Sequence, residues 1–153
     1  MFWNPELSPE GPVGIVVSGA EQRAHIYRNG VLIGQVPLAI TDPERPLPAG
    51  VSIVLEGFSD EPNPFAPDLP MPLWMAVALP TGATHADYHT ELVGRIRANP
   101  KIGHDLFSLL QPGDSLVITN LPLSSESTTD RDFVIASSQV PEGTEEAGSG
   151  SGE

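Results

Sequence analysis

Two histidines and two carboxylates lie within seven positions near the middle of the chain: His85, Asp87, His89 and Glu91. His85 and His89 are four residues apart, a spacing that places two imidazoles on one face of a helix, as in helical zinc sites. No third ligand is spaced to match, so two exposed histidines near a helix start explain the pattern as well. General acid or base chemistry at His85, helped by His89 or Asp87, is a further alternative. We predict no metal and no cofactor.

Arginines form the next candidate group, because Arg23, Arg28, Arg95 and Arg97 supply four of the seven cationic residues. A guanidinium binds a carboxylate through two parallel hydrogen bonds, so the four arginines could form a patch for the carboxylates of peptide stems. The 20 Asp and Glu residues offer ordinary ion pairs instead. Both interpretations stay open from the sequence.

The sequence gives little support to thiolate, serine-hydrolase or calcium sites. The chain has no cysteine, which excludes disulfides and thiolate chemistry. No serine lies in a Gly-x-Ser-x-Gly context, so a serine hydrolase is not predicted. Asp60, Glu61 and Asp68 lack the ligand spacing of a calcium loop. The residues predicted to serve structure alone are His25, His104, Trp3 and Trp74.

The elements that position these residues are predicted to be mostly β-strands. Asn29-Gly30 joins two apolar, β-branched runs, and this dipeptide favours a two-residue hairpin turn because both residues tolerate positive φ. Residues 73–78 read as a buried strand. The predicted strands are 13–18, 24–28, 31–36, 51–55, 73–78 and 115–119, with a short last strand at 133–135.

Two helices are predicted between the last strands. Apolar residues at helical spacing predict a helix over residues 88–97, with Asp87 as its N-cap. A second helix begins after Asn99, which can cap it, and Pro100 suits its first position. The apolar face of that helix is Ile102, Leu106, Leu109 and Leu110.

Length and composition indicate one loop-rich globular domain. The 153 residues include 17 Pro and 15 Gly, which favours a mainly β protein over a helical bundle. We expect an N-terminal arm over residues 1–12 and the domain proper over 13–138. Residues 139–153 are rich in Gly, Glu and Ser and are predicted to be a disordered acidic tail.

The net charge of -13 limits the partners. Such a surface repels phosphate backbones, so nucleic acid and anionic membranes are not predicted as partners. No apolar run approaches the roughly 18 residues of a membrane span. The N-terminus has neither the basic region nor the apolar core of a signal peptide.

Four segments of the chain form a recognisable series. They are residues 11–34 around the hairpin, Leu47-Pro48-Ala49-Gly50-Val51, Met71-Pro72-Leu73-Trp74-Met75, and residues 107–119. In this order they resemble the catalytic domain of L,D-transpeptidases, the YkuD-like family that cross-links or decorates bacterial peptidoglycan. The likeness runs from about residue 10 to residue 120. The fold that the resemblance implies is a mainly β, L,D-transpeptidase-like sandwich with one or two short helices.

In that family the chemistry depends on a His followed by Gly or Ala, and on a Ser-His-Gly-Cys-x-Arg segment whose Cys attacks the acyl donor. His85-Ala86 stands at the place of the first His, and residues 92–97 stand at the place of the second segment. Gly94 and Arg97 are kept. Leu92 replaces the Ser, Val93 the activating His, and Arg95 the Cys.

A guanidinium is not a nucleophile at neutral pH, so the family's reaction is not expected in this chain. The resemblance implies an inactive domain with vestigial positions His85, Gly94, Arg95 and Arg97. It would be a binding, structural or regulatory module linked to peptidoglycan in the periplasm or cell envelope, with a stem peptide or an envelope protein as partner. The alternatives are a peptidoglycan-directed enzyme with altered chemistry using His85, or an acidic domain that binds a protein partner.

Overall fold

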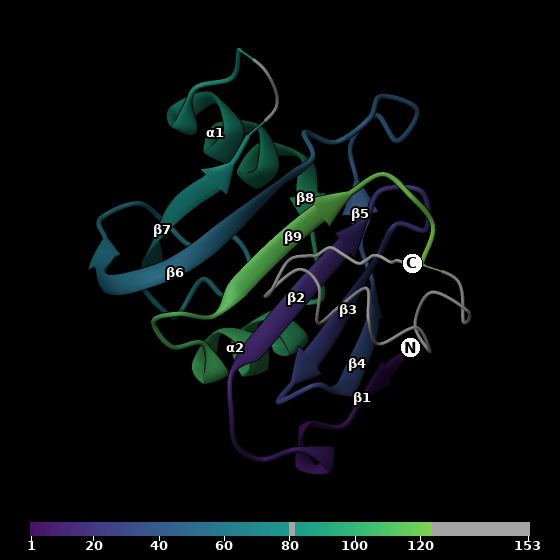
Figure 1. The fold of residues 1–153 in the computed structure, drawn as a ribbon, viewed down its shortest axis with the longest axis vertical. Coiled ribbons are helices and arrows are strands. Elements are labelled where there is room, and N and C mark those ends of the chain that lie inside the picture. Colours follow the sequence, from purple (N-terminus) through teal and green to yellow (C-terminus); the bar gives the residue numbers. More distant parts are fainter. Residues whose placement is uncertain (80–81, 124–153) are drawn as a thin grey trace, which may run out of the picture. The chain divides into compact units, whose positions relative to one another are not determined.

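The structure is a computed structural model that describes residues 1–79 and 82–123, with only the backbone of His85. Residues 1–122 form one compact unit, and residues 123–153 belong to a second. Within the described residues, nine strands and two α-helices confirm the predicted mainly β class (Figure 1). The strands are β1 Phe2–Trp3, β2 Val13–Ser18, β3 Arg23–Arg28, β4 Val31–Pro37, β5 Ala39–Ile40, β6 Gly50–Ser59, β7 Met71–Ala78, β8 Ile96–Arg97 and β9 Ser115–Thr119.

Seven of these strands form one mixed sheet, in the order β1-β4-β3-β2-β9-β6-β7. The last strand, β9, lies between β2 and β6, parallel to β2 and antiparallel to β6 (Figure 1). All other neighbours in the sheet are antiparallel. β5 and β8 form a separate two-stranded sheet. Strands far apart in the sequence therefore meet at the centre of the molecule's main sheet.

The predicted hairpin is confirmed. β3 and β4 pair antiparallel and are joined by Asn29 and Gly30, whose φ angles are 52° and 81°. Positive φ at both positions is what a type I′ turn requires, and its twist matches that of the two strands. The Asn29-Gly30 turn, a signal local in the sequence, therefore sets the pairing of β3 with β4.

The first helix, α1, spans His85–Arg95, and its start differs from the prediction. The N-cap is Thr84, whose Oγ1 accepts a hydrogen bond from the backbone N–H of Asp87 at 3.1 Å. Asp87 instead lies in the first turn, where its carboxylate complements the helix dipole. The predicted end at residue 97 is also wrong, because Ile96–Arg97 leave the helix to form β8.

The second helix, α2, spans Pro100–Leu109 and confirms the predicted capping. The Oδ1 atom of Asn99 accepts hydrogen bonds from the backbone N–H groups of Lys101 and Ile102, at 2.9 and 3.2 Å. Ile102 and Leu106 are buried, whereas Leu109 is only partly buried. The helix therefore turns its apolar face inward as its spacing predicted.

The hydrophobic core lies between one face of the main sheet and the two helices. Alternate residues of β2 and β3 contribute Ile15, Val17 and Ile26, and Leu92 of α1 and Ile102 of α2 pack in the same cluster. Burial of these side chains is the main favourable term for the fold. The helices are thus held on the sheet by apolar packing.

Strand β7 is not the buried strand that its composition predicted. Leu73, Met75 and Val77 are 39%, 46% and 52% exposed. These three residues alternate with Ala76, which packs against the core, so they lie on the face of the edge strand β7 that is turned away from the core. Composition indicates strand propensity, but the position in the sheet decides how much of a strand is buried.

A proline-rich loop, residues 60–70, closes one side of the core. Asn63 is buried and organises it, since Oδ1 accepts from the N–H groups of Phe65 and Ala66, and Nδ2 donates to the carbonyl of Pro70. Phe65 stacks on Phe107 of α2, with ring centroids 5.8 Å apart. The loop is therefore fastened to α2.

The N-terminal arm is part of the main sheet. Residues 1–12, the expected arm, contain β1 and a 3-10 turn at Pro5–Leu7, and β1 pairs with β4. The Nε1 of Trp3 donates to Asp105 of α2 at 3.2 Å. The expected strand at residues 133–135, the domain end at 138 and the tail at 139–153 lie outside the described residues.

Candidate functional site

The segment of residues 92–97, which the sequence suggested as the place of the nucleophile motif, lies where α1 ends and β8 begins. Leu92 is buried in the core, and Val93 lines a cavity beneath the helix. Gly94 is exposed, and a side chain at its Cβ position would meet no atom within 4 Å. Residues 92–95 are therefore the last turn of a helix with an apolar inner side, and residues 96–97 are a short strand.

Arg95 is buried, with 4% of its surface exposed. A guanidinium has five N–H donors, and here five acceptors lie within hydrogen-bond distance. Nε and the two terminal nitrogens donate to the carbonyl oxygens of Thr41 (3.0 Å), Asp42 (2.8 Å), Arg45 (2.6 Å) and Pro46 (2.9 Å) and to Glu91 Oε2 (3.1 Å). The group thus fastens the loop of residues 41–46 to α1 and keeps no donor for a ligand.

Glu91 supplies the countercharge for this buried cation. Its Oε2 lies 3.1 Å from Nη1 of Arg95 and 2.8 Å from Nη1 of Arg45. Glu91 is one helical turn before Arg95, a spacing at which oppositely charged side chains meet. A buried charge needs such pairing, because desolvation alone would cost several kcal/mol per ion, an order-of-magnitude figure.

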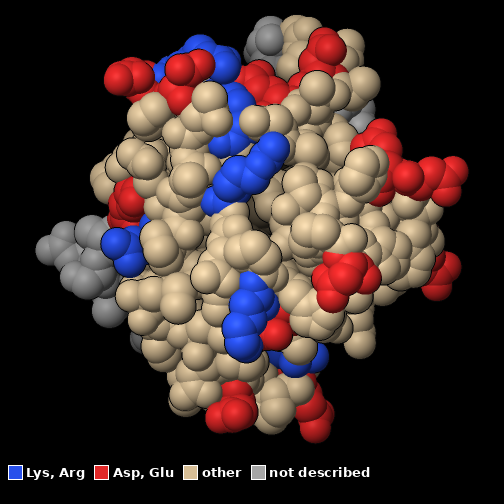
Figure 2. Space-filling model, turned by 180° about the vertical axis from the view of Figure 1, so that it is seen from behind, with Lys and Arg blue, Asp and Glu red and all other residues tan. Residues whose placement is uncertain are grey.

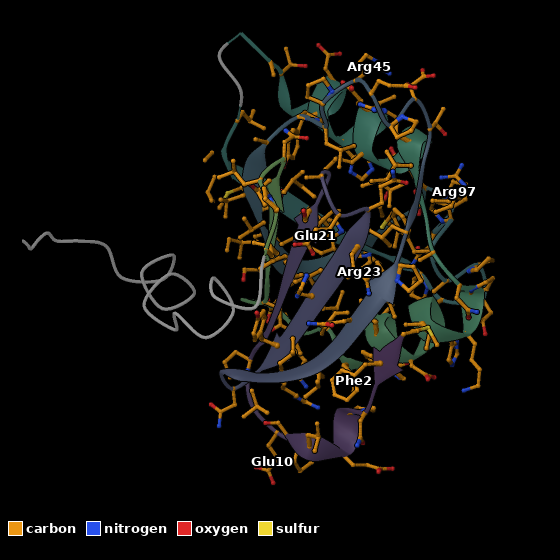
Figure 3. All side chains as sticks on the ribbon, turned by 90° about the vertical axis from the view of Figure 1, so that its right-hand side faces the viewer. Phe2, Glu10, Glu21, Arg23, Arg45 and Arg97 are labelled. Carbon is orange, nitrogen blue, oxygen red and sulfur yellow. The ribbon has the colours of Figure 1, made fainter. Side chains whose placement is uncertain are left out.

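The other arginines of the predicted carboxylate patch do not converge on one site. Nη1 of Arg97 donates to the carbonyls of Val93 and Ile96 at the end of α1, and Arg28 donates to the carbonyl of Gly11. Figure 3 shows Arg23, Arg45 and Arg97 at separate places on the molecule. Three of the four candidates, Arg28, Arg95 and Arg97, donate to backbone carbonyls.

Figure 2 shows how charge is distributed over one face of the molecule. In Figure 2, acidic side chains lie around the edge of this face, with a few Lys and Arg side chains running down its middle. With 7 Lys and Arg against 20 Asp and Glu, carboxylates outnumber the available cations. The distribution fits ion pairing of the cations better than a patch reserved for an anionic ligand.

Two histidines, His89 of the candidate cluster and His104 of α2, each have a carboxylate partner on a different element. Nε2 of His89 lies 3.2 Å from Oε1 of Glu61, and Nδ1 of His104 lies 3.0 Å from Oδ2 of Asp68. The hydrogen bond from His104 lowers the pKa of Asp68, with minor contributions from the backbone and from the charge of His104. Both pairs join the proline-rich loop to the helices.

His85 is the first residue of α1, and its side chain lies outside the described part of the structure. Among the side chains that are described, no three His, Cys, Asp or Glu residues form a group that could hold a metal ion. His25 is buried between Glu21, at 3.0 Å, and Gln35, at 3.5 Å, and stabilises the sheet.

A cavity of about 120 Å³ lies beneath α1 and α2, against the inner face of the sheet. Its walls are apolar except for Ser52 of β6 and Tyr88 and His89 of α1, and Trp74 of β7 lies in its wall. The sequence indicated Tyr88 only as part of an apolar helix face. The one available signal was that this position carries a hydroxyl where a Phe would serve the packing equally well.

Tyr88 is 3% exposed, and its Oη is the single buried side-chain polar atom without a hydrogen-bond partner among the described residues. Burial raises the pKa of Tyr88, and the nearby Ser52 hydroxyl opposes part of that rise. The phenol therefore stays protonated and able to donate. It is an unusual group to leave unpaired in an apolar interior.

Neither a family model nor a curated protein matches the chain. Solved structures of L,D-transpeptidases are similar in fold. L,D-transpeptidase 1 of Mycobacterium tuberculosis is 17% identical, with a TM-score of 0.42, over 71% of this chain and 62% of its own.

Two further structures give similar values. The L,D-transpeptidase of Mycobacterium smegmatis is 15% identical, with a TM-score of 0.42, over 69% of this chain and 58% of its own. The catalytic domain of the Enterococcus faecium enzyme, acylated by ertapenem, is 17% identical, with a TM-score of 0.39, over 71% and 98%. The chain spans less than two thirds of the length of the two mycobacterial structures. No helix in the described residues has the length and apolarity to cross a membrane.

Proposed function

We propose that the chain is a catalytically inactive, L,D-transpeptidase-like domain that acts as a binding, structural or regulatory module linked to bacterial peptidoglycan. The proposal starts from the four segments of the sequence that resemble that family, from the hairpin to the closing helix and strand. The domain would extend over residues 13–138 and work in the periplasm or cell envelope. Its partner would be a stem peptide or an envelope protein.

The observation that carries the proposal is the environment of Arg95. The residue stands where the family's nucleophile belongs, and all five of its N–H donors are engaged by four carbonyls and Glu91. It can neither attack an acyl donor nor bind the carboxylate of a stem peptide. With no cysteine anywhere in the sequence, the thiolate step of the family has no substitute at this position.

The geometry also supports a loss of the site rather than its adaptation. The segment that replaces the catalytic motif is the end of a helix whose inner side, Leu92 and Val93, faces the apolar interior. An active-site loop needs backbone N–H groups free to hold an oxyanion. In an α-helix interior those groups are already bonded to carbonyls four residues earlier.

Co-sedimentation with isolated peptidoglycan sacculi tests the binding role. We expect a saturable fraction of the chain in the pellet, retained at about 0.5 M salt, because a surface of charge -13 cannot depend on attraction to an anionic polymer. An unrelated acidic protein of similar size is the control. A chain that stays in the supernatant at every sacculus concentration contradicts the proposal, and soluble muropeptides released by it would support the altered enzyme instead.

A further inference from the structure

The cavity beneath α1 and α2 is not explained by the loss of the transpeptidase site. Its volume of about 120 Å³ is close to that of an apolar protein cavity that takes up benzene. Well-packed cores contain few voids of this size, because each one forfeits dispersion contacts along its walls. A natural sequence that keeps such a space between a sheet and two helices has room for one small molecule.

The walls define the chemistry of that molecule. Ile15 and Val17 of β2, Leu92 of α1 and Leu106 of α2 supply flat or branched apolar surface on opposite sides. A charged ligand would lose its hydration there without compensation. The occupant must therefore be mostly apolar and uncharged.

Tyr88 adds a single polar contact to these apolar walls. Its hydroxyl is buried, has no hydrogen-bond partner and belongs to a side chain that lines the cavity. Ser52, also buried, lines the cavity from the facing strand β6. Buried hydroxyls are normally satisfied, and beside the Ser52 side chain the Tyr88 hydroxyl can donate to an acceptor atom of a molecule in the cavity.

Most of the lining side chains are buried, but seven are only partly buried: Phe65, Trp74, His89, Val93, Ala98, Phe107 and Leu116. Four of them, Phe65, His89, Val93 and Phe107, come from the proline-rich loop, α1 and α2. We infer that a small molecule enters between these three segments.

We propose that this cavity binds a small, uncharged, mostly apolar molecule of about the size of phenol, whose single oxygen accepts a hydrogen bond from the hydroxyl of Tyr88. Leu92, Val93 and Ile96 of residues 92–97 line the cavity, but Arg95 does not, so the buried guanidinium takes no part in the site. The inference goes beyond the proposed role at peptidoglycan and holds whether or not the chain binds sacculi.

Titration with phenol and benzene tests the proposal, since the two probes differ by one hydroxyl. Calorimetry on the full chain gives the affinities, and emission of Trp74 in a Trp3→Phe background locates the binding. Trp3 is not a lining residue, so its replacement leaves the cavity intact. We expect saturable binding of both probes at one site, with phenol the tighter.

Tyr88→Phe is the decisive variant, because it keeps the ring and removes only the unpaired hydroxyl. We expect phenol to bind about 3- to 10-fold more weakly to Tyr88→Phe, and benzene to bind as before. Ala98→Leu, which adds volume at the lining, should weaken both probes. The proposal is wrong if neither probe binds saturably, or if phenol binds equally well to the chain and to Tyr88→Phe.

Discussion

Arg95 is a structural residue. Its buried guanidinium joins α1 to the loop of residues 41–46, at the position where the sequence resemblance suggested the family's nucleophile. The acceptors are four backbone carbonyls, which every residue possesses. No side-chain pattern in the sequence could therefore predict these contacts, although the i,i+4 partner Glu91 could be predicted.

Arg95→Lys should destabilise the chain although the charge is kept. An ammonium has three donors in place of five, so at least two buried acceptors lose their partners. We expect a loss of about 2 to 4 kcal/mol in the free energy of unfolding, measured by urea denaturation. Arg45→Lys, at the exposed end of the same network, is the control and should stay within about 0.5 kcal/mol. Equal effects of the two changes would contradict the role given to Arg95.

Tyr88 predicts a specific pH dependence of stability. Its folded-state pKa is raised by burial, so the unfolded state loses the phenolic proton first as pH rises. The contribution of protonated Tyr88 to the free energy of unfolding is fully present below the unfolded-state pKa of 10.0. It is lost as pH rises through the folded-state pKa.

Tyr88→Phe removes that dependence and also the unpaired hydroxyl. We expect the variant to be more stable by about 1 kcal/mol near neutral pH, with an advantage that grows above pH 10. Urea denaturation of both chains across this pH range measures the difference. An advantage that stays constant or shrinks with rising pH would show that the phenol is not protected by burial.

At the scale of elements, the sequence predicted the turns and caps that depend on residues close together in the chain. The Asn29-Gly30 hairpin and the Asn99 cap of α2 were both correct, because a turn or a cap is decided within a few residues. The start of α1 was missed by three residues, since Thr84 and Asp87 are both good caps. Its end was missed because Ile96 leaves the helix to pair with Ile40, a partner far away in the sequence.

Two glycines make a matched test of how the helices are placed. A Cβ on Gly103 of α2 would overlap the carbonyl of Phe65, whereas a Cβ on Gly94 of α1 would meet nothing within 4 Å. We expect Gly103→Ala to destabilise the chain by at least about 2 kcal/mol, because the overlapping atom is backbone and cannot turn aside.

Gly94→Ala should have the opposite effect. It adds helix propensity in open space and should stabilise the chain by about 0.5 to 1 kcal/mol. Thermal unfolding of both variants measures the contrast. A loss of stability in Gly94→Ala would mean that this kept residue of the family motif still has a conformational role.

At the scale of the whole molecule, the strand order depends on contacts between residues far apart in the chain, which sequence patterns do not predict. The position of β9 between β2 and β6 follows from packing of the entire core and not from any local signal. The exposed side of β7 has the same origin, because Leu73 and Met75 alternate with Ala76, which packs against the core, and so lie on the opposite face of the sheet. The class of the fold was predictable from composition and strand patterns, but the order of the strands was not.

The net charge of -13 predicts a salt dependence of stability. Like charges on a compact surface repel one another, and salt screens this repulsion. We expect the midpoint of thermal unfolding to rise by about 3 °C between about 10 and 150 mM sodium chloride, which corresponds to about 1 kcal/mol. A midpoint that is unchanged or lower in salt would mean that ion pairs outweigh the repulsion.

The intact mass of the chain after incubation with a carbapenem tests the central claim most directly, that the scaffold is present while the nucleophile is gone. A cysteine-containing L,D-transpeptidase treated in parallel is the positive control, and heat-unfolded chain reports any non-specific acylation. The account predicts an unchanged mass for the folded chain, because Arg95 is held by carbonyls and no thiol exists. A stable, stoichiometric adduct on the folded chain would contradict it.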